Sequence, residues 1–191
     1  MSSDPARLVL VVGPSGAGKD TLMRAAAALL MDAPDIVFVR RAITRISDAS
    51  EDHDSLTPEA FAAMVEEGAF ALHWSAHGLD YGIPRAGLRT GGVAVCNGSR
   101  AIAGQARALY PHSQIVLVTA PPEVLAARLR ARGRESAIED RLNRQVARES
   151  WQADLVIDNS GPVAAGAQRL ADFLRAQSCH ECRLAEQATS A

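Results

Sequence analysis

One short segment combines glycines with a lysine in a spacing that suits polyphosphate binding. Glycines allow successive backbone N–H groups to converge on phosphate oxygens, and a lysine directly after them can reach the outer phosphates of a polyphosphate. The sequence therefore predicts a phosphate-binding loop of the Walker A type, in which Lys19 also acts in catalysis. The loop consists of Gly13, Pro14, Ser15, Gly16, Ala17, Gly18, Lys19, Asp20 and Thr21.

The distribution of basic residues supports this interpretation. Of the 20 lysines and arginines in the chain, Lys19 is the only lysine. A compact ammonium that fits beneath a phosphate loop cannot be exchanged for a planar guanidinium without loss. The alternative is a glycine-rich turn between a buried strand and a helix, and it does not explain why the single lysine stands at this position.

The loop departs from the Walker A pattern at Asp20. A serine or threonine usually stands there and ligates Mg²⁺, whereas here Thr21 follows one place later. A carboxylate can hold Mg²⁺ directly or through water. Without a cation, the phosphates would repel it by roughly 4 kcal/mol per charge pair at about 4 Å and an effective dielectric of about 20. We therefore expect Asp20 and Thr21 to hold Mg²⁺; alternatively, Asp20 only stabilises the first helical turn.

Length and composition indicate one domain without a membrane-spanning segment. The chain has 191 residues, 48% of them hydrophobic, and a net charge of -2, which suits one well-packed core. It has no apolar run of about eighteen residues and no basic signal-peptide end, so we expect a cytoplasmic protein. Cys96, Cys179 and Cys182 do not form a disulfide framework. We interpret residues 179–191 as a mobile tail rather than a metal site.

Apolar runs of strand length alternate with helical stretches. The strand-like runs are 8–12, 36–39, 93–96, 115–118 and 155–157, and the helical stretches are 22–30, 102–109, a stretch from 122 and 163–176. This order predicts an α/β fold, a three-layer sandwich with a central, mostly parallel sheet. Between them, the sequence predicts a polar loop over 46–55, a helix over about 57–68 capped by Thr57, a strand over 70–76 and a turn over 77–82.

Polar residues gather where strands are predicted to end. Ligands of open parallel sheets bind just beyond the carboxyl ends of the strands, and guanidinium groups bind phosphate oxygens in pairs. The candidate acceptor-binding residues are Arg41, Thr44, Arg45, His53, His77, Asp80, Tyr81, Asn97, Ser99 and Arg100. Asp158 and Asn159 are candidates for contact with the nucleotide base. The alternative for the arginines is a solvated basic edge.

Seven arginines lie between residues 128 and 148. Arg128 and Arg132 are four residues apart and share a helix face, and a lid is predicted over 132–137. Cations that close over transferring phosphates offset the charge of the transition state, so Arg128, Arg132 and Arg141 are candidate catalytic residues. A nucleic-acid-binding stripe is the alternative, but acidic residues interrupt the stretch and the whole chain is slightly acidic.

In this order, the motifs resemble the guanylate kinase family of P-loop kinases along nearly the whole chain. The matching segments are 13–19, 43–45, 81–82, 128–129, 132–133, 141–142 and 158–159. The resemblance implies one kinase domain over residues 1–178 that uses ATP and Mg²⁺. It also implies a small acceptor-binding insertion over about residues 40–90 and the arginine-rich lid.

The chain departs from that family at the positions that recognise guanine. In the family, a serine four places before Arg45 and an acid before the tyrosine turn contact the base, whereas here Arg41 and Leu72 stand there. Loss of the acid forfeits base discrimination, and the added arginine suggests an anion in place of the base. With segments 51–53, 74–78 and 97–100, the chain is similar to the ribose 1,5-bisphosphate phosphokinases, which form 5-phosphoribosyl 1-diphosphate in phosphonate breakdown.

This resemblance implies a small-molecule acceptor, with no nucleic-acid or membrane partner, and leaves the oligomeric state open. A phosphate acceptor has a second pKa of about 6 and is mostly dianionic at neutral pH, so no catalytic base is needed. His53, His77 and Asp80 are then expected to contact ribose hydroxyls. Two alternatives stay open: a nucleoside monophosphate kinase such as a guanylate kinase, and a non-catalytic guanylate-kinase-like binding module. Arg41 and Leu72 count against the first, and Lys19 against the second.

Overall fold

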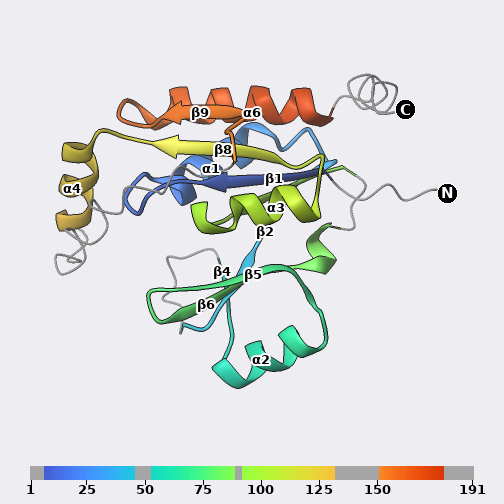
Figure 1. Ribbon diagram of the computed structural model, residues 1–191. Helices are drawn as coiled ribbons and strands as arrows, with labels where there is room; N and C mark the ends of the chain where they lie inside the picture. Colours follow the sequence, from blue (N-terminus) through green and yellow to red (C-terminus); the bar gives the residue numbers. More distant parts are fainter. Residues whose placement is uncertain (1–6, 46–52, 89–91, 132–150, 179–191) are drawn as a thin grey trace.

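The structure is a computed structural model that describes residues 7–45, 53–88, 92–131 and 151–178 (Figure 1). Its main sheet has five strands in the order β2-β7-β1-β8-β9, and every pairing between neighbours is parallel. The strands are β1 (Arg7–Val12), β2 (Ile36–Val39), β7 (Val93–Asn97), β8 (Gln114–Thr119) and β9 (Leu155–Asp158). The predicted α/β fold with a mostly parallel central sheet is thereby confirmed.

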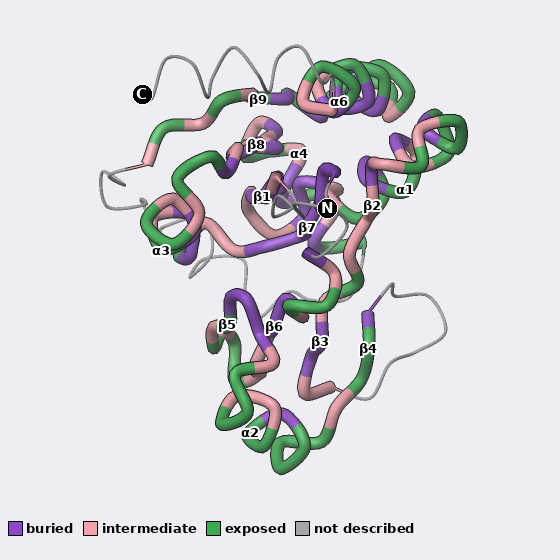
Figure 2. Tube along the Cα trace, turned by 90° about the vertical axis from the view of Figure 1, so that its right-hand side faces the viewer, coloured by how far each residue is buried: buried purple, intermediate pink, exposed green. Residues whose placement is uncertain are grey.

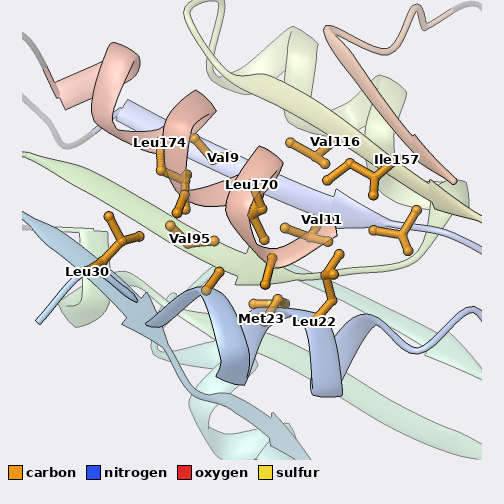
Figure 3. Close-up of a cluster of buried hydrophobic side chains, with 14 of the residues drawn as sticks. Val9, Val11, Leu22, Met23, Leu30, Val95, Val116, Ile157, Leu170 and Leu174 are labelled. Carbon is orange, nitrogen blue, oxygen red and sulfur yellow. The ribbon is translucent and has the colours of Figure 1, made fainter. Parts of the chain in front are cut away.

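Helices cover both faces of the main sheet. They are α1 (Lys19–Leu29), α3 (Ala103–Leu109), which follows the 3₁₀ turn Arg100–Ile102, α4 (Pro122–Ala131) and α6 (Val163–Ser178). Val9 and Val11 of β1 belong to the hydrophobic cluster that contains residues of α1 and α6, as Figure 3 shows. Leu8 and Leu10 belong to the cluster on the opposite side, with residues of α3. Because β1 is buried on both faces, its sequence is a continuous apolar run.

A second sheet lies below the main sheet in Figure 1. Its strand order is β4-β3-β6-β5, and its elements are β3 (Arg41–Ile43), β4 (His53–Ser55), α2 (Pro58–Glu66), β5 (Phe70–Ala76) and β6 (Leu79–Pro84). The predicted cap of α2 is confirmed, because the Ala60 N–H donates to Thr57 Oγ1 at 3.2 Å. The core of this sheet is small: Phe61 of α2 stacks on Phe70 of β5 at 4.7 Å between ring centroids.

Two sequence predictions within this region were wrong. Part of the expected loop over 46–55 is a strand, β4, because His53–Ser55 pairs with Arg41–Ile43, a partner that the local sequence does not reveal. The expected turn over 77–82 comprises only His77 and Gly78, and β6 begins at Leu79. Both turn residues have positive φ, 55° and 72°, as a two-residue type I′ hairpin requires. Histidine at the first position concealed that signal.

Figure 2 shows that the buried backbone is concentrated in the main sheet and that the second sheet has a more exposed periphery. Cys96 lies fully inside the main sheet, and burial raises the pKa of its thiol. Among the described residues, no helix combines the length and hydropathy needed to cross a membrane. The predicted lid over 132–137, with Arg132, and the predicted tail over 179–191 lie outside the described residues, as does Arg141.

Candidate active site

The phosphate-binding loop connects β1 to α1 at the carboxyl edge of the main sheet. A Cβ atom on Gly13 would lie 2.1 Å from the carbonyl oxygen of Val118 in β8, so only glycine fits there. Gly18 precedes the first turn of α1 with a φ of 84°, in the left-handed region that favours glycine. The loop therefore has the shape that its glycines predict.

Lys19 begins α1, and its ammonium group points back over the loop. Its Nζ donates to the carbonyl oxygens of Gly13 at 3.0 Å and Pro14 at 3.4 Å. The ammonium group is therefore held beside the loop by two backbone carbonyl oxygens.

Arg128 and Asn159, which the sequence predicts to lie at the nucleotide site, support the phosphate loop in this structure. Asn159 is 3% exposed, and its Nδ2 donates to the Ala17 carbonyl at 2.7 Å. Arg128 donates to the Asn159 carbonyl at 2.8 Å and to the Gly16 carbonyl at 3.4 Å. Arg128 thus ties α4, the segment after β9 and the loop together. Both side chains are positioning residues in this arrangement.

Asp158 stands directly before Asn159 in the chain, and its side chain is exposed. Two hydrogen bonds from Ser160 hold the pKa of the Asp158 carboxyl below its ordinary value. The bond from the Ser160 side chain has the larger effect, and the bond from its backbone N–H has the smaller one. The carboxylate is therefore ionised at neutral pH and caps the turn after β9. It does not line the pocket described below.

Asp20 links the phosphate loop to the second sheet. Its Oδ1 accepts a hydrogen bond from Asn97 Nδ2 at the end of β7 and lies 3.9 Å from Arg41 Nη2 in β3. Asn97 is buried, whereas 59% of the Asp20 side chain is exposed. Three elements, α1, β7 and β3, therefore meet at one carboxylate oxygen.

Aromatic rings form one wall of the site on the side of the second sheet. Trp74 and Tyr81 face each other across the β5–β6 hairpin, with ring centroids 5.3 Å apart and an interplanar angle of 8°. The Arg41 guanidinium carbon lies 5.7 Å from the centre of the Tyr81 ring, within the range of a cation–π contact. Arg41 is thereby held between an aromatic face and the Asp20 carboxylate.

Thr44 and Asp80 join the end of β3 to this hairpin. The Asp80 N–H donates to Thr44 Oγ1 at 2.8 Å, and the Thr44 N–H donates to the Asp80 carbonyl at 3.0 Å. The Asp80 carboxylate accepts a hydrogen bond from Ser75 at 2.5 Å. These contacts position the next residues along the chain, Arg45 and Tyr81, which both line the pocket.

One pocket of about 230 Å³ is lined both by the phosphate loop and by residues of the second sheet. Of the predicted residues, those that line it are Gly13, Ser15, Gly16, Gly18, Lys19, Asp20, Thr21, Arg41, Arg45, His77, Tyr81, Asn97 and Ser99. The predicted residues that the structure describes but that do not line the pocket are Pro14, Ala17, Thr44, His53, Asp80, Arg100, Arg128, Asp158 and Asn159. Sequence reasoning missed Trp74, which also lines the pocket; its pairing with Tyr81 becomes visible only once the hairpin register is known.

His53 lies in β4 opposite Arg41 and is only 3% exposed. Burial lowers the pKa of its imidazole, and the nearby positive charges of Arg45, Arg41 and Arg40 lower it further, against a smaller opposite effect of Asp20. The imidazole is therefore neutral at pH 7. It does not line the pocket, although Arg41 opposite it does.

Comparison with known proteins gives several similar sequences. A family model described as an AAA domain matches residues 9–152. Ribose 1,5-bisphosphate phosphokinase PhnN of Rhodopseudomonas palustris is 49% identical over 176 residues, which cover 90% of this chain and 89% of that protein. The proteins of the same name from Bradyrhizobium diazoefficiens and Acidiphilium cryptum are 44% and 50% identical, over 93% and 88% of this chain and 92% and 93% of their own lengths.

Solved structures share the fold at low sequence identity. Guanylate kinase from Anaplasma phagocytophilum has a TM-score of 0.68 and 20% identity, and the match covers 96% of this chain and 92% of that one. A sugar kinase from Janibacter sp. has a TM-score of 0.51 and 21% identity, over 92% of this chain and 100% of that one. These similarities establish a guanylate-kinase-like fold.

Proposed function

Because this chain belongs to the family of the ribose 1,5-bisphosphate phosphokinases, we propose that it catalyses phosphoryl transfer from ATP to ribose 1,5-bisphosphate. The products are 5-phosphoribosyl 1-diphosphate and ADP, and the reaction serves phosphonate breakdown. The observation that carries the proposal is a single pocket in which Lys19 and the phosphate loop face Arg41, Arg45 and Tyr81. A pocket with cations on both sides suits the approach of two anionic substrates.

The proposed chemistry is a direct displacement at the γ-phosphorus of ATP. An oxygen of the acceptor's 1-phosphate forms a bond to the γ-phosphorus, and the bond from that phosphorus to the β,γ-bridging oxygen breaks, which releases ADP. The acceptor phosphate is already dianionic at neutral pH, so no side chain has to remove a proton. The pocket's described residues therefore act by alignment and charge stabilisation.

The donor side supplies the loop N–H groups and Lys19. In the proposed complex, Lys19 exchanges its contacts with the Gly13 and Pro14 carbonyls for phosphate oxygens. Asp20 and Thr21 fit Mg²⁺, because both line the pocket beside Lys19 and offer hard oxygen atoms. When bound, this ion would neutralise charge on the transferring phosphates. Arg128 and Asn159 contribute by holding the loop in shape.

The acceptor side supplies Arg45 and Arg41, and His77 and Ser99 also line the pocket. Arg45 follows Thr44, whose backbone and hydroxyl are fixed to Asp80, so its position is set by the hairpin. Guanidinium groups bind phosphate in a bidentate manner. We propose that these arginines bind the bisphosphate and that Trp74 and Tyr81 shield the sugar from bulk water.

A guanylate kinase activity is the main alternative, and one observation counts against it. The position at which that family carries a base-recognising acid is Leu72, which is 1% exposed and packs in the hydrophobic cluster with Leu8 and Ile83. It does not line the pocket. A buried leucine cannot hydrogen-bond a purine edge, so the described pocket offers no counterpart of that contact.

A coupled assay of ADP release tests the proposal directly. ATP, Mg²⁺ and the protein are combined with either ribose 1,5-bisphosphate or GMP, and the product is identified by phosphorus NMR. We expect ADP release and a new diphosphate signal with the bisphosphate. Turnover of GMP alone would support a guanylate kinase, and the absence of ATP consumption with either acceptor would support a non-catalytic binding module.

A further inference from the structure

A second cavity, of about 100 Å³, adjoins the pocket at three shared residues, Asp20, Arg41 and Asn97. Its remaining charged residue is Arg24 of α1, which does not line the main pocket. We propose that this cavity is the subsite for the distal phosphate of the acceptor, the 5-phosphate that does not react, and that Arg24 and Arg41 bind it. The inference rests on the proposed function and deepens it.

The position of Arg24 along α1 separates the two phosphate sites. Arg24 follows Asp20 by four residues, so both lie on one face of α1, about 6 Å apart along its axis. The reacting phosphate must lie in the main pocket beside Lys19, because it has to reach the γ-phosphorus. The other end of the sugar can then extend past Arg41 towards Arg24, one helical turn from the phosphate loop.

The charges of the second cavity favour an anion. Arg24 and Arg41 contribute two positive charges and Asp20 one negative charge, which leaves a net charge of +1 among its lining residues. The Asp20 oxygen nearest Arg41 already accepts a hydrogen bond from Asn97. The Arg24 guanidinium is exposed, and within the described part of the chain it makes no hydrogen bond or ion pair. Its planar fork is therefore available for bidentate phosphate binding.

The apolar part of the cavity wall limits what can enter. Met23, Phe38 and Val39 line it beside the charged groups, and such an apolar wall lowers the dielectric on one side of those charges. Its volume, about 100 Å³, is less than half the roughly 230 Å³ of the main pocket. The cavity therefore suits one substituent of a ligand whose remainder lies in the main pocket.

The test compares two acceptors that differ only in the distal phosphate, ribose 1,5-bisphosphate and ribose 1-phosphate. Steady-state kinetics with each acceptor give the selectivity, the ratio of their kcat/KM values. We expect R24Q to lower this selectivity by roughly 10- to 100-fold, through a higher KM for the bisphosphate, because a charged hydrogen-bond donor is lost. The matched control is R169Q, an exposed arginine of α6 outside both cavities, and its selectivity should equal that of the wild type.

Unchanged selectivity in R24Q, or equal losses with both acceptors, would overturn the subsite. Failure of the wild-type protein to use the bisphosphate would instead contradict the proposed function. In that case, calorimetric titration with ribose 5-phosphate still tests the subsite by itself. Weaker binding to R24Q than to the wild type and R169Q supports it, and equal binding to all three proteins overturns it.

Discussion

The main sheet and the second sheet position their functional residues by different means. The main sheet is buried on both faces by two large hydrophobic clusters, and its backbone fixes the phosphate loop by a close contact with β8. The second sheet packs Leu72 and Ile83 into the second of these clusters and has a small separate core of Ala42, Phe61 and Phe70 beside α2. Side-chain stacks and hydrogen bonds place its pocket residues. Close backbone packing thus has the larger part in shaping the proposed donor site, and side-chain contacts have the larger part in shaping the proposed acceptor site.

This difference has a consequence for stability and specificity. Segments with few buried apolar contacts open at lower free energy than the core of a domain, so the part of the second sheet around α2 is expected to open before the main sheet. Side-chain contacts can also change without altering the main sheet. The same fold can therefore keep one donor site and accept different acceptors.

The largest effect is expected at the donor site. K19A should reduce kcat/KM by about 10³-fold or more, because the ammonium group that stabilises the transferring phosphate is lost. K19R should fail similarly, since a planar guanidinium does not replace a compact ammonium beneath the loop. Circular dichroism should show an intact fold. Full activity of K19A in the coupled assay would contradict the assignment of the loop.

The next largest effects concern stability and differ between the main hydrophobic cluster and the small cluster beside α2. Leu170 is fully buried in the main cluster and Phe61 is 5% exposed in the small one. L170A should destabilise the whole protein by about 2–5 kcal/mol in urea unfolding. F61A should raise amide hydrogen exchange mainly in the second sheet and weaken acceptor binding while ATP binding persists. Uniform loss of protection in F61A would show that the two sheets unfold as one unit.

A smaller effect is expected where the two sides meet. N97D would replace the hydrogen bond from Asn97 to the Asp20 carboxylate with a repulsion between two carboxylates. We expect kcat/KM for the acceptor to fall about 10-fold or more, which corresponds to about 1.4 kcal/mol. The double variant D20N/N97D restores one hydrogen-bond donor at this contact but removes the carboxylate proposed to hold Mg²⁺, so it should recover part of the loss in KM for the acceptor and not in kcat. If N97D had the kinetics of the wild type, the hydrogen bond between Asn97 and Asp20 would have no role in acceptor use.

The smallest effect concerns pH. Burial and the neighbouring arginines lower the pKa of His53 in the folded protein, so below a pH of about 6.5 the unfolded chain binds a proton that the folded chain does not. Above that pH the imidazole is neutral in both states, so the lowered pKa costs no stability. As the pH falls towards the folded pKa, the free energy of unfolding decreases. H53Q should therefore lose less stability than the wild type between pH 7 and pH 5 in thermal unfolding. Equal losses of stability in H53Q and the wild type over this pH range would contradict this prediction.

Some features of the acceptor site could not be predicted because they depend on contacts between distant segments. The strand at His53–Ser55 exists through its pairing with Arg41–Ile43. The pairing of Trp74 with Tyr81 needs the hairpin register. Arg24 has the sequence context of any exposed helical arginine, and only the second cavity distinguishes it.

The sequence by itself determined the phosphate loop, the capped helix α2 and the alternation of strands and helices in the main sheet. These features are local, because glycine conformation, capping and burial on both faces all leave a signature in consecutive residues. Only the tertiary structure decided that Arg128 and Asn159 support the loop and that Asp20 links it to Asn97 and Arg41. These roles depend on which side chains packing brings within hydrogen-bond distance, and sequence spacing does not encode that distance.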